Sequence, residues 1–279
     1  MQDSTLINKY DILKASLKSK RRLAVALSGG IDSTFLLFAA KECLPVDSII
    51  AVTADGSVFP SREVEAAKSI AESFGIRHML FHFDPLEIEG FSENTSERCY
   101  LCKKHLYRSM ITAVREEGDF VLCEGTNVDD EKLDHPGIKA LDERGVFSPF
   151  REYGFTKAEI IKLAKILDIP GADKPSCACL ATRVPYGENL GEKLLGIIDE
   201  AENFIISKGF KQVRVRAHGT IFARIELGSS EISKFVAADV RFDVYEKLKS
   251  LGFAYVTLDV LGYRQGSFDE YIKARGLKG

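Results

Sequence analysis

The feature that most limits the fold is a glycine-containing turn between an apolar run and a helical pattern. Residues 23–27 are uniformly apolar, which is typical of a strand buried on both faces. Residues 28–33 then read Ser-Gly-Gly-Ile-Asp-Ser, and an apolar helical pattern follows. Glycines let backbone N–H groups approach an anion closely, and a helix N-terminus adds a partial positive charge. The sequence therefore predicts a strand–turn–helix unit that holds a phosphate group.

The same turn lacks two common nucleotide-binding motifs and resembles a third. Neither Gly-Lys-Ser/Thr nor Gly-x-Gly-x-x-Gly is present at this turn. Ser-Gly-Gly-x-Asp-Ser instead resembles the pyrophosphatase-type P-loop (PP-loop) of ATP-using synthetases. That resemblance implies cleavage of ATP between its α- and β-phosphates, which releases pyrophosphate and leaves AMP on an oxygen of the substrate. The alternative is an ordinary strand–turn–helix capped by Asp32 or Ser33.

Length and composition favour a soluble protein with two compact cores. The chain has 279 residues, of which 28% are charged and 45% are hydrophobic. A formal charge of −3 gives no overall attraction to nucleic acid or to anionic membranes. No secretory signal begins the sequence, and no apolar stretch approaches the ~20 residues that span a bilayer. We expect a cytoplasmic protein without nucleic-acid or membrane partners, whose six cysteines are reduced.

Strand-like and helical segments alternate through the first two thirds of the chain. The strand-like runs are 23–27, 48–54, 78–83 and 120–123, and the helical patterns between them are 32–43, 61–74 and 99–117. This alternation predicts an α/β fold with a doubly wound parallel sheet, which we assign to a first domain of residues 1–184. In such sheets, ligands bind at the carboxyl ends of the strands where the topology switches.

The nucleotide site is therefore expected at the ends of these strands. The residues expected to bind ATP are Ala26, Leu27, Ser28, Gly29, Gly30, Asp32, Ser33, Thr53, Gly125, Thr126 and Asn127. Gly125 permits close backbone approach, while Thr126 and Asn127 offer donors to a phosphate or a ribose. Asp32 is the stronger candidate for a Mg²⁺ ligand, and Asp129 with Asp130 is the weaker one. A polar turn without a ligand is the alternative interpretation of the Gly125 loop.

The rest of the chain predicts a loop, a linker and a second domain. Residues 131–144 are polar and are expected to form a long loop or lid, and residues 156–167 form a helix with a capping box. Residues 174–185 are expected to form a linker, because this segment contains prolines. Residues 185–279 follow as a smaller α+β domain, consistent with a ferredoxin-like module. Its expected order is helix 191–208, strands 212–217 and 220–227, helix 238–251 and strand 254–260.

Four cysteines occur in two close pairs. Cys99 and Cys102 begin a predicted helix, so their sulfurs lie on one face, and basic neighbours favour the thiolate form. Cys177 and Cys179 form the second pair. These residues could hold zinc with four thiolates, or an iron–sulfur cluster with three thiolates and one open iron. A single reactive cysteine, or four buried small hydrophobes, are the other interpretations. The remaining cysteines are expected in the core: Cys43 and Cys123.

Two arginines on one predicted strand are candidates for binding an anion. Arg214 and Arg216 alternate, so both guanidinium groups leave the same face, and Glu226 lies on the next strand. Two guanidinium groups can bind a phosphate or a carboxylate in a bidentate manner. A solvated sheet face is the alternative.

These residues together resemble a known family. The whole chain is similar to the ATP-dependent sulfur transferases of the LarE type, which act in maturing the nickel-pincer nucleotide cofactor of lactate racemase. The PP-loop is shared by many synthetases, whereas the later motifs together are much more specific. The resemblance rests on the PP-loop, Glu97-Arg98-Cys99-Tyr100-x-Cys102-Lys103, Glu124-Gly125-Thr126-Asn127, Pro175-Ser176-x-Ala178-Cys179-Leu180-Ala181-Thr182-Arg183, and Leu261-Gly262-Tyr263-Arg264-x-Gly266-Ser267.

The resemblance implies a two-step reaction. ATP converts a carboxylate of pyridinium-3,5-biscarboxylate mononucleotide into an acyl-adenylate, sulfur displaces AMP to give a thiocarboxylate, and a second round treats the other carboxylate. In one branch of the family the sulfur comes from a cysteine that matches Cys179 and becomes dehydroalanine. In another, three cysteines hold a [4Fe–4S] cluster whose open iron carries an exogenous sulfide. The additional cysteines of this chain favour the cluster, with Cys99, Cys102 and Cys179 as ligands and Cys177 as the alternative third.

The resemblance also implies roles for single residues. Cys179 and Asp32 are expected to be catalytic. The expected substrate-binding residues are Tyr100, Arg183, Arg214, Arg216 and Glu226, with the Tyr100 ring stacking on the pyridinium. The family suggests a homo-oligomer. Three rivals remain: a tRNA thiolase, which would need an extended basic face, an amide-forming synthetase, which would not need four cysteines, and a protein that senses ATP without cleaving it.

Overall fold

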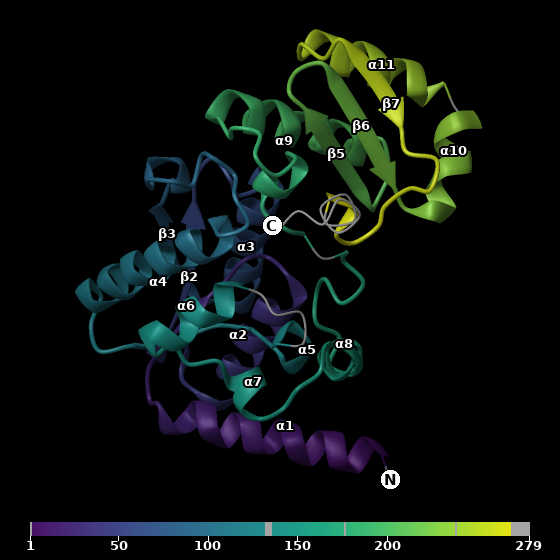
Figure 1. Cartoon of the computed structure of the whole chain (residues 1–279). Helices are drawn as coiled ribbons and strands as arrows, with labels where there is room; N and C mark the ends of the chain where they lie inside the picture. The colour runs from purple at the N-terminus through teal and green to yellow at the C-terminus, as the bar shows by residue number, and fades with distance from the viewer. Residues whose placement is uncertain (1, 132–135, 176, 238, 269–279) are drawn as a thin grey trace. The chain divides into compact units, whose positions relative to one another are not determined.

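The computed structural model describes residues 2–131, 136–175, 177–237 and 239–268 (Figure 1). The chain divides into two compact units, Met1–Phe83 with Cys99–Cys177, and Asp84–Arg98 with Ala178–Gly279. Residues 84–98 thus belong to the second unit, although they come before residue 184 in the sequence. The domain boundary that we assigned at residue 184 stays a prediction. Residues 132–135 of the expected loop and Ser176 of the cysteine motif lie outside the described residues.

The first unit is built on a parallel sheet of four strands. They are β1 (Leu23–Ala26), β2 (Ile49–Asp55), β3 (Arg77–His82) and β4 (Val121–Cys123), in the order β3-β2-β1-β4. The chain moves outward from β1 to β3 and then returns to the other side of β1. The topology therefore switches between β1 and β4. In such sheets, ligands bind at the carboxyl ends of the strands beside this switch point.

Helices cover both faces of this sheet, as a doubly wound fold requires. One buried cluster joins β1 to α1 (Gln2–Ser19), α2 (Ile31–Cys43), α3 (Ser61–Phe74), α7 (Pro149–Glu152) and α8 (Lys157–Ile166). A second cluster joins the sheet to α4 (Arg98–Glu116) and α6 (Pro136–Arg144). Leu23 and Val25 belong to the first cluster and Ala24 to the second, because neighbouring side chains of a strand point to opposite faces. The predicted α/β fold is confirmed.

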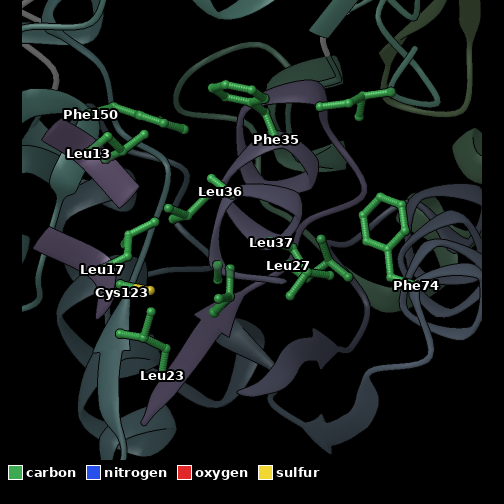
Figure 2. Packing of buried hydrophobic residues seen from close by; sticks show 14 of the residues in the cluster. Leu13, Leu17, Leu23, Leu27, Phe35, Leu36, Leu37, Phe74, Cys123 and Phe150 are labelled. Carbon is green, nitrogen blue, oxygen red and sulfur yellow. The ribbon is translucent and has the colours of Figure 1, made fainter. Parts of the chain in front are cut away.

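The larger core surrounds α2. Figure 2 shows Phe35, Leu36 and Leu37 of α2 among side chains of α1, β1 and α3, with the sulfur of Cys123 in the same cluster. Cys123 is fully buried, which confirms the expectation that it is a core residue, whereas Cys43 is half-buried and packs against this cluster from outside. Full burial of a leucine or phenylalanine stabilises a fold by about 1.5–3 kcal/mol. This packing fixes α2, and with it the turn at its N-terminus.

The ring of Tyr10 stacks on Phe35, with centroids 5.5 Å apart, but its buried hydroxyl has no hydrogen-bond partner among the described residues. Burial raises the pKa of Tyr10 well above its usual value. Because an unpaired buried hydroxyl is unfavourable, we expect Tyr10→Phe to raise the free energy of unfolding by about 1 kcal/mol, measured by urea denaturation. Tyr153→Phe is the matched control, because the Tyr153 hydroxyl donates to Ser16 Oγ at 2.9 Å. Loss of stability in both variants alike would contradict the prediction.

The predicted loop at residues 131–144 contains helices in its described part. The structure has α5 (Val128–Glu131) and α6, in which Ala140 and Leu141 are both buried and Leu141 belongs to the second cluster. The expectation of an irregular lid was wrong there, because these apolar residues anchor a helix that Pro136 begins. The helix expected at 156–167 is confirmed as α8, with both hydrogen bonds of its capping box.

The second unit contains a mixed sheet of three strands in the order β5-β6-β7. β5 (Val213–His218) pairs antiparallel with β6 (Phe222–Leu227), and β6 pairs parallel with β7 (Tyr255–Leu258). The α+β class is confirmed. The ferredoxin-like arrangement is corrected, since it needs another strand between β6 and β7. The segment before α9 forms η3 (Leu180–Arg183), a 3₁₀ helix, and supplies no such strand.

The helices of this unit are α9 (Glu192–Ser207), α10 (Ile232–Ala237) and α11 (Val240–Ser250), with the latter two connecting β6 to β7. The remaining short 3₁₀ helices of the chain are η1 (Val46–Ser48), η2 (Pro85–Glu87) and η4 (Ser229–Glu231). The predicted linker is packed rather than free where it forms η3, because Leu180 and Ala181 are buried.

Candidate functional site

The turn after β1 has the backbone of a phosphate cradle. Gly29 has φ +77°, and a Cβ there would lie 2.5 Å from the carbonyl oxygen of Glu63. Only glycine fits such a position without strain. The N–H of Ser28 donates to Ser33 Oγ at 3.1 Å, and Ser33 Oγ donates to the carbonyl oxygen of Gly30 at 3.0 Å. Gly30 is the N-cap of α2 and has no side chain to cap it, so the N-terminus of this helix is suited to a bound anion.

The loop after β4 lies against this turn. A Cβ on Gly125 would lie 3.1 Å from backbone atoms of Asp32 and Ser33, so the two loops contact each other at the switch point. The buried carboxylate of Glu124 accepts hydrogen bonds from Thr126 N (3.0 Å) and Thr126 Oγ1 (2.6 Å), and also from Ser148 Oγ. The Thr126 hydroxyl thus supports the loop in this structure, and its predicted contact with the nucleotide stays a prediction.

Asn127 also organises this loop. Its Oδ1 accepts from the N–H of Asp129 at 2.9 Å, and its own N–H donates to Asp130 Oδ2 at 3.0 Å. The Asp129 carboxylate in turn accepts from the N–H of Lys157 at 2.9 Å. These bonds join the loop after β4 to the start of α8. The predicted role of Asn127 in binding the nucleotide remains a prediction.

Asp32 fits the predicted role of a Mg²⁺ ligand. One carboxylate oxygen pairs with the Lys157 ammonium, and the other, Oδ1, is buried without a hydrogen-bond partner among the described residues. Burial raises the pKa of Asp32, Lys157 opposes this rise, and the charge of Asp130 adds to it. An unpaired carboxylate oxygen beside a phosphate cradle suits a hard cation that also binds phosphate oxygens. Asp130 lies near enough for its negative charge to act on the Asp32 carboxylate.

Thr53 fixes the end of β1 rather than facing solvent. Its hydroxyl donates to the carbonyl oxygen of Leu27 at 2.7 Å, and His78 Nε2 lies 2.8 Å from the same hydroxyl. Because the single hydroxyl proton is used on Leu27, His78 must donate, which places its proton on Nε2. Burial lowers the pKa of His78, which favours this neutral form. His78 forms no ligand cluster with other histidines in the sequence, so this contact was not predicted.

Sequence reasoning also missed the lysines of the site. Lys174 Nζ donates to the Gly29 carbonyl oxygen at 3.1 Å and to Glu63 Oε2 at 2.7 Å. Lys157 pairs with Asp32, as described above. Two features of the sequence could have identified these lysines. Lys174 comes directly before the Pro-Ser-x-Ala-Cys motif. Lys157 lies in the first turn of a predicted helix, where a cation is unfavourable.

The cysteines are divided between the two units. Cys99 and Cys102 lie half-buried in the first turn of α4, and Cys177, also half-buried, accepts a hydrogen bond from Arg62 Nη2 at 3.3 Å in the first unit. Cys179 belongs to the second unit, where it is the N-cap of η3. Among the described residues, no group of three or more His, Cys, Asp or Glu side chains could hold a metal ion. The predicted ligand set therefore stays a prediction.

Tyr100 has the surroundings of a ring that attracts cations. The ammonium groups of Lys104 and Lys139 lie 5.3 and 5.2 Å from its ring centre. Its hydroxyl donates to the carboxylate of Glu143 at about 3 Å. The predicted stacking on a pyridinium agrees with this environment but is not tested by it.

Arg183 positions the cysteine segment in the second unit. Its guanidinium is fully buried and pairs with Glu202 through two bonds, of 2.8 and 3.1 Å. Its Nη1 donates to the carbonyl oxygens of Ala178 at 2.7 Å and Cys179 at 3.0 Å. Glu202 Oε1 also accepts from the N–H of Val215 at 3.0 Å. This buried pair joins the backbone at Cys179 to β5, while the substrate contact predicted for Arg183 stays a prediction.

Arg214 and Arg216 lie on one face of β5, as expected from their alternation. Both are buried, with 5% of each exposed, so the alternative of a solvated face was wrong. Arg216 donates to Glu226 Oε2 at 2.9 Å, and Arg224 lies 3.1 Å from Glu226 Oε1. Arg214 lies over the Tyr263 ring, 5.2 Å from its centre. Arg214 lies opposite Glu226 in the strand pair, and Arg224 also lies 3.3 Å from Asp259. Three guanidinium groups beside two carboxylates leave an excess of positive charge, which suits an anionic ligand.

None of the described helices is both long enough and apolar enough to cross a bilayer.

Several known proteins are similar to this chain in sequence. The sequence profile of the asparagine synthase family matches residues 10–97, which contain the turn after β1. The pyridinium-3,5-bisthiocarboxylic acid mononucleotide synthase of Lactiplantibacillus plantarum is 36% identical over 267 residues, which cover 96% of this chain and 96% of that protein. An uncharacterised protein of Synechocystis is 32% identical over 96% of this chain and 99% of its own length. The argininosuccinate synthase of Halobacterium salinarum is 27% identical over 53% of this chain and 40% of that protein.

Proposed function

Because the chain belongs to the LarE family of ATP-dependent sulfur-transferring enzymes, we propose that it makes the two thiocarboxylates of pyridinium-3,5-bisthiocarboxylic acid mononucleotide. The substrate is the corresponding biscarboxylate mononucleotide, and each carboxylate consumes one ATP. The observation that carries the proposal is similarity over almost the whole length of a synthase of that name. The cradle at Gly29 and the unpaired oxygen of Asp32 support the ATP-dependent half of the reaction.

In the first step, a substrate carboxylate oxygen attacks the α-phosphorus of ATP, and the bond to the pyrophosphate oxygen breaks. The backbone N–H groups of the turn after β1 neutralise charge on the departing pyrophosphate. Asp32, with Asp130 as a second acidic group, would hold Mg²⁺, which supplies further neutralisation of the phosphates. The product is an acyl-adenylate, whose AMP is a much better leaving group than the oxygen of a free carboxylate.

In the second step, a sulfur nucleophile attacks the acyl carbon, the C–O bond to AMP breaks, and a thiocarboxylate results. We propose Cys99, Cys102 and Cys179 as the ligands of a [4Fe–4S] cluster, with Cys177 as the alternative third. Cys99 and Cys102 fit such a pair, because they lie one turn apart in α4. The cluster would supply a bound sulfide as the nucleophile. Sacrifice of Cys179 is the alternative source of sulfur.

We propose that residues of the second unit bind the phosphate of the nucleotide substrate. The buried guanidinium groups of Arg214 and Arg216 would bind its phosphate, and Glu226 would keep them oriented. Tyr100 would stack on the pyridinium ring, whose positive charge an aromatic face attracts. Arg183 would act through the backbone at Cys179. We further propose that the enzyme is a homo-oligomer.

The sulfur donor is tested by anaerobic purification with iron and acid-labile sulfide analysis. We expect about four irons per chain, with loss of iron in Cys99→Ser and Cys102→Ser and wild-type iron in the core control Cys43→Ser. An iron-free protein that loses about 34 Da from Cys179 after turnover would instead establish sacrifice of that cysteine.

The overall reaction is tested by mixing the enzyme with MgATP, sulfide and the biscarboxylate mononucleotide. Mass spectrometry is expected to detect AMP, pyrophosphate and a product in which sulfur replaces one carboxylate oxygen at each position. Transfer of sulfur to tRNA under the same conditions, without a thiocarboxylate, would reassign the enzyme to the tRNA thiolases. AMP formation without any sulfur product would also contradict the proposal.

A further inference from the structure

Lys157 occupies a position that is electrostatically unfavourable for a lysine. It is the first residue of α8, directly after the N-cap Thr156, at the helix end that carries partial positive charge. Its ammonium bonds to Asp32 in the first turn of α2, so it also lies beside the positive end of a second helix. A cation in such a place needs a nearby anion. Breaks of a local rule of this kind are expected at functional sites.

The backbone at Lys157 is held firmly at the topological switch point. Its N–H donates to Asp129 Oδ2 at 2.9 Å, and the N–H of Val128 donates to the carbonyl oxygen of Phe155 at 3.0 Å. The side chain is less confined, with 34% of it exposed. The ammonium group can therefore change partners by side-chain rotation alone, while its Cα stays in place beside the phosphate cradle.

Asp32 can accept a second cation. Lys157 occupies Oδ2, whereas Oδ1 is buried and has no hydrogen-bond partner among the described residues. Asp130, whose charge acts on Asp32, adds negative charge at the same place. The negative charge at this place is therefore greater than that of Asp32 alone, and such a site would attract a free divalent cation if the Lys157 ammonium were removed.

We propose that Lys157 is an exchangeable counter-ion that couples metal binding to nucleotide binding. In the nucleotide-free enzyme its ammonium neutralises Asp32 and weakens the binding of free Mg²⁺. With MgATP bound, Asp32 ligates the metal and the Lys157 ammonium turns to the oxygens of the pyrophosphate leaving group. The inference rests on the proposed function, because it requires Asp32 to bind the metal of MgATP.

The test measures Mn²⁺ binding to the nucleotide-free enzyme by electron paramagnetic resonance, in addition to AMP formation. Lys157→Met removes the charge with little change of volume. We expect the variant to bind free Mn²⁺ at least tenfold more tightly than the wild type. Its rate of AMP formation with MgATP is expected to fall about 10²-fold, as for the loss of one preorganised donor to a transition state. A purely structural lysine would not move these two quantities in opposite directions.

Two further variants complete the test. Lys157→Arg keeps the charge and should retain the weak Mn²⁺ binding of the wild type. Lys165→Met, on the same helix but in an exposed pair with Asp173, should change neither quantity. If Lys157→Met does not fold, Lys157→Gln takes its place in the same titration.

The possible outcomes are distinguishable. Unchanged Mn²⁺ affinity in the Lys157 variant would overturn the counter-ion role. Tighter Mn²⁺ binding with unchanged AMP formation would overturn the contact with pyrophosphate. If the wild type forms no AMP, the proposed function fails, and the proposed contact of Lys157 with pyrophosphate fails with it. The nucleotide-free titration would then still report whether Lys157 keeps metal away from Asp32.

Discussion

Gly29→Ala is expected to reduce ATP-dependent AMP formation by about 10²-fold or more, because a misplacement of about 1 Å in a positioning loop has an effect of this size. The backbone of Gly29 has φ +77°, which side chains with a Cβ rarely adopt. The added carbon would also lie 2.5 Å from the carbonyl oxygen of Glu63, a backbone atom that cannot rotate away. The turn must therefore move, and the N–H groups that we propose to face the phosphates move with it.

A graded series of glycine variants controls this prediction. At Gly125, a Cβ would lie 3.1 Å from the backbone of Asp32, so Gly125→Ala should have a smaller effect on AMP formation. At Gly196, inside α9, an added Cβ would meet no heavy atom within 4 Å beyond the neighbouring backbone of its own helix, and Gly196→Ala should leave activity unchanged. That variant should be more stable by about 1 kcal/mol, because alanine favours a helix interior. Similar rates for the Gly29 and Gly196 variants would contradict the structural role assigned to the turn.

The sequence predicted best those features whose determinants are local. The apolar run before Ser28 and the glycines after it specify β1 and its turn, because few other residues permit this backbone. Thr156, followed three residues later by Glu159, specifies the N-terminus of α8 by the capping box alone. The parallel sheet followed from the alternation of such segments. For the same reason, the loops that follow β1 and β4 could be placed together before the structure was known.

Features set by distant partners could not be predicted in this way. The pairing of Lys157 with Asp32 joins residues 125 positions apart, and Lys174 with Glu63 joins residues 111 apart. The polar residues at 131–144 concealed a helix, because Ala140 and Leu141 are the only buried apolar side chains in the described part of this segment. The alternating arginines Arg214 and Arg216 were also compatible with a sheet face exposed to solvent. The burial of Arg214 depends on residues of β6 and on Tyr263, which the local pattern does not reveal.

The second prediction with a large effect concerns the buried pair of Arg183 and Glu202. Both side chains are fully buried, and Glu202 also accepts the N–H of Val215, at one edge of the small sheet. Glu202→Ala would leave the Arg183 charge buried without its counter-ion. We therefore expect a loss of about 3–5 kcal/mol in the free energy of unfolding, measured by urea denaturation. Because Arg183 also holds the carbonyl oxygen of Cys179, the same variant should loosen the backbone at that cysteine.

Two comparisons show whether the effect arises from burial of the pair. Asp173→Asn breaks the exposed pair with Lys165, and should lower the free energy of unfolding by less than about 1 kcal/mol. The double variant Arg183→Met with Glu202→Leu removes both charges and keeps similar volume, so it should be more stable than Glu202→Ala alone. If the double variant were the less stable of the two, the cause would be lost packing, and the unpaired charge of Arg183 would not explain the destabilisation. If instead Glu202→Ala lost no more stability than Asp173→Asn, the buried pair would not be what joins the cysteine segment to β5.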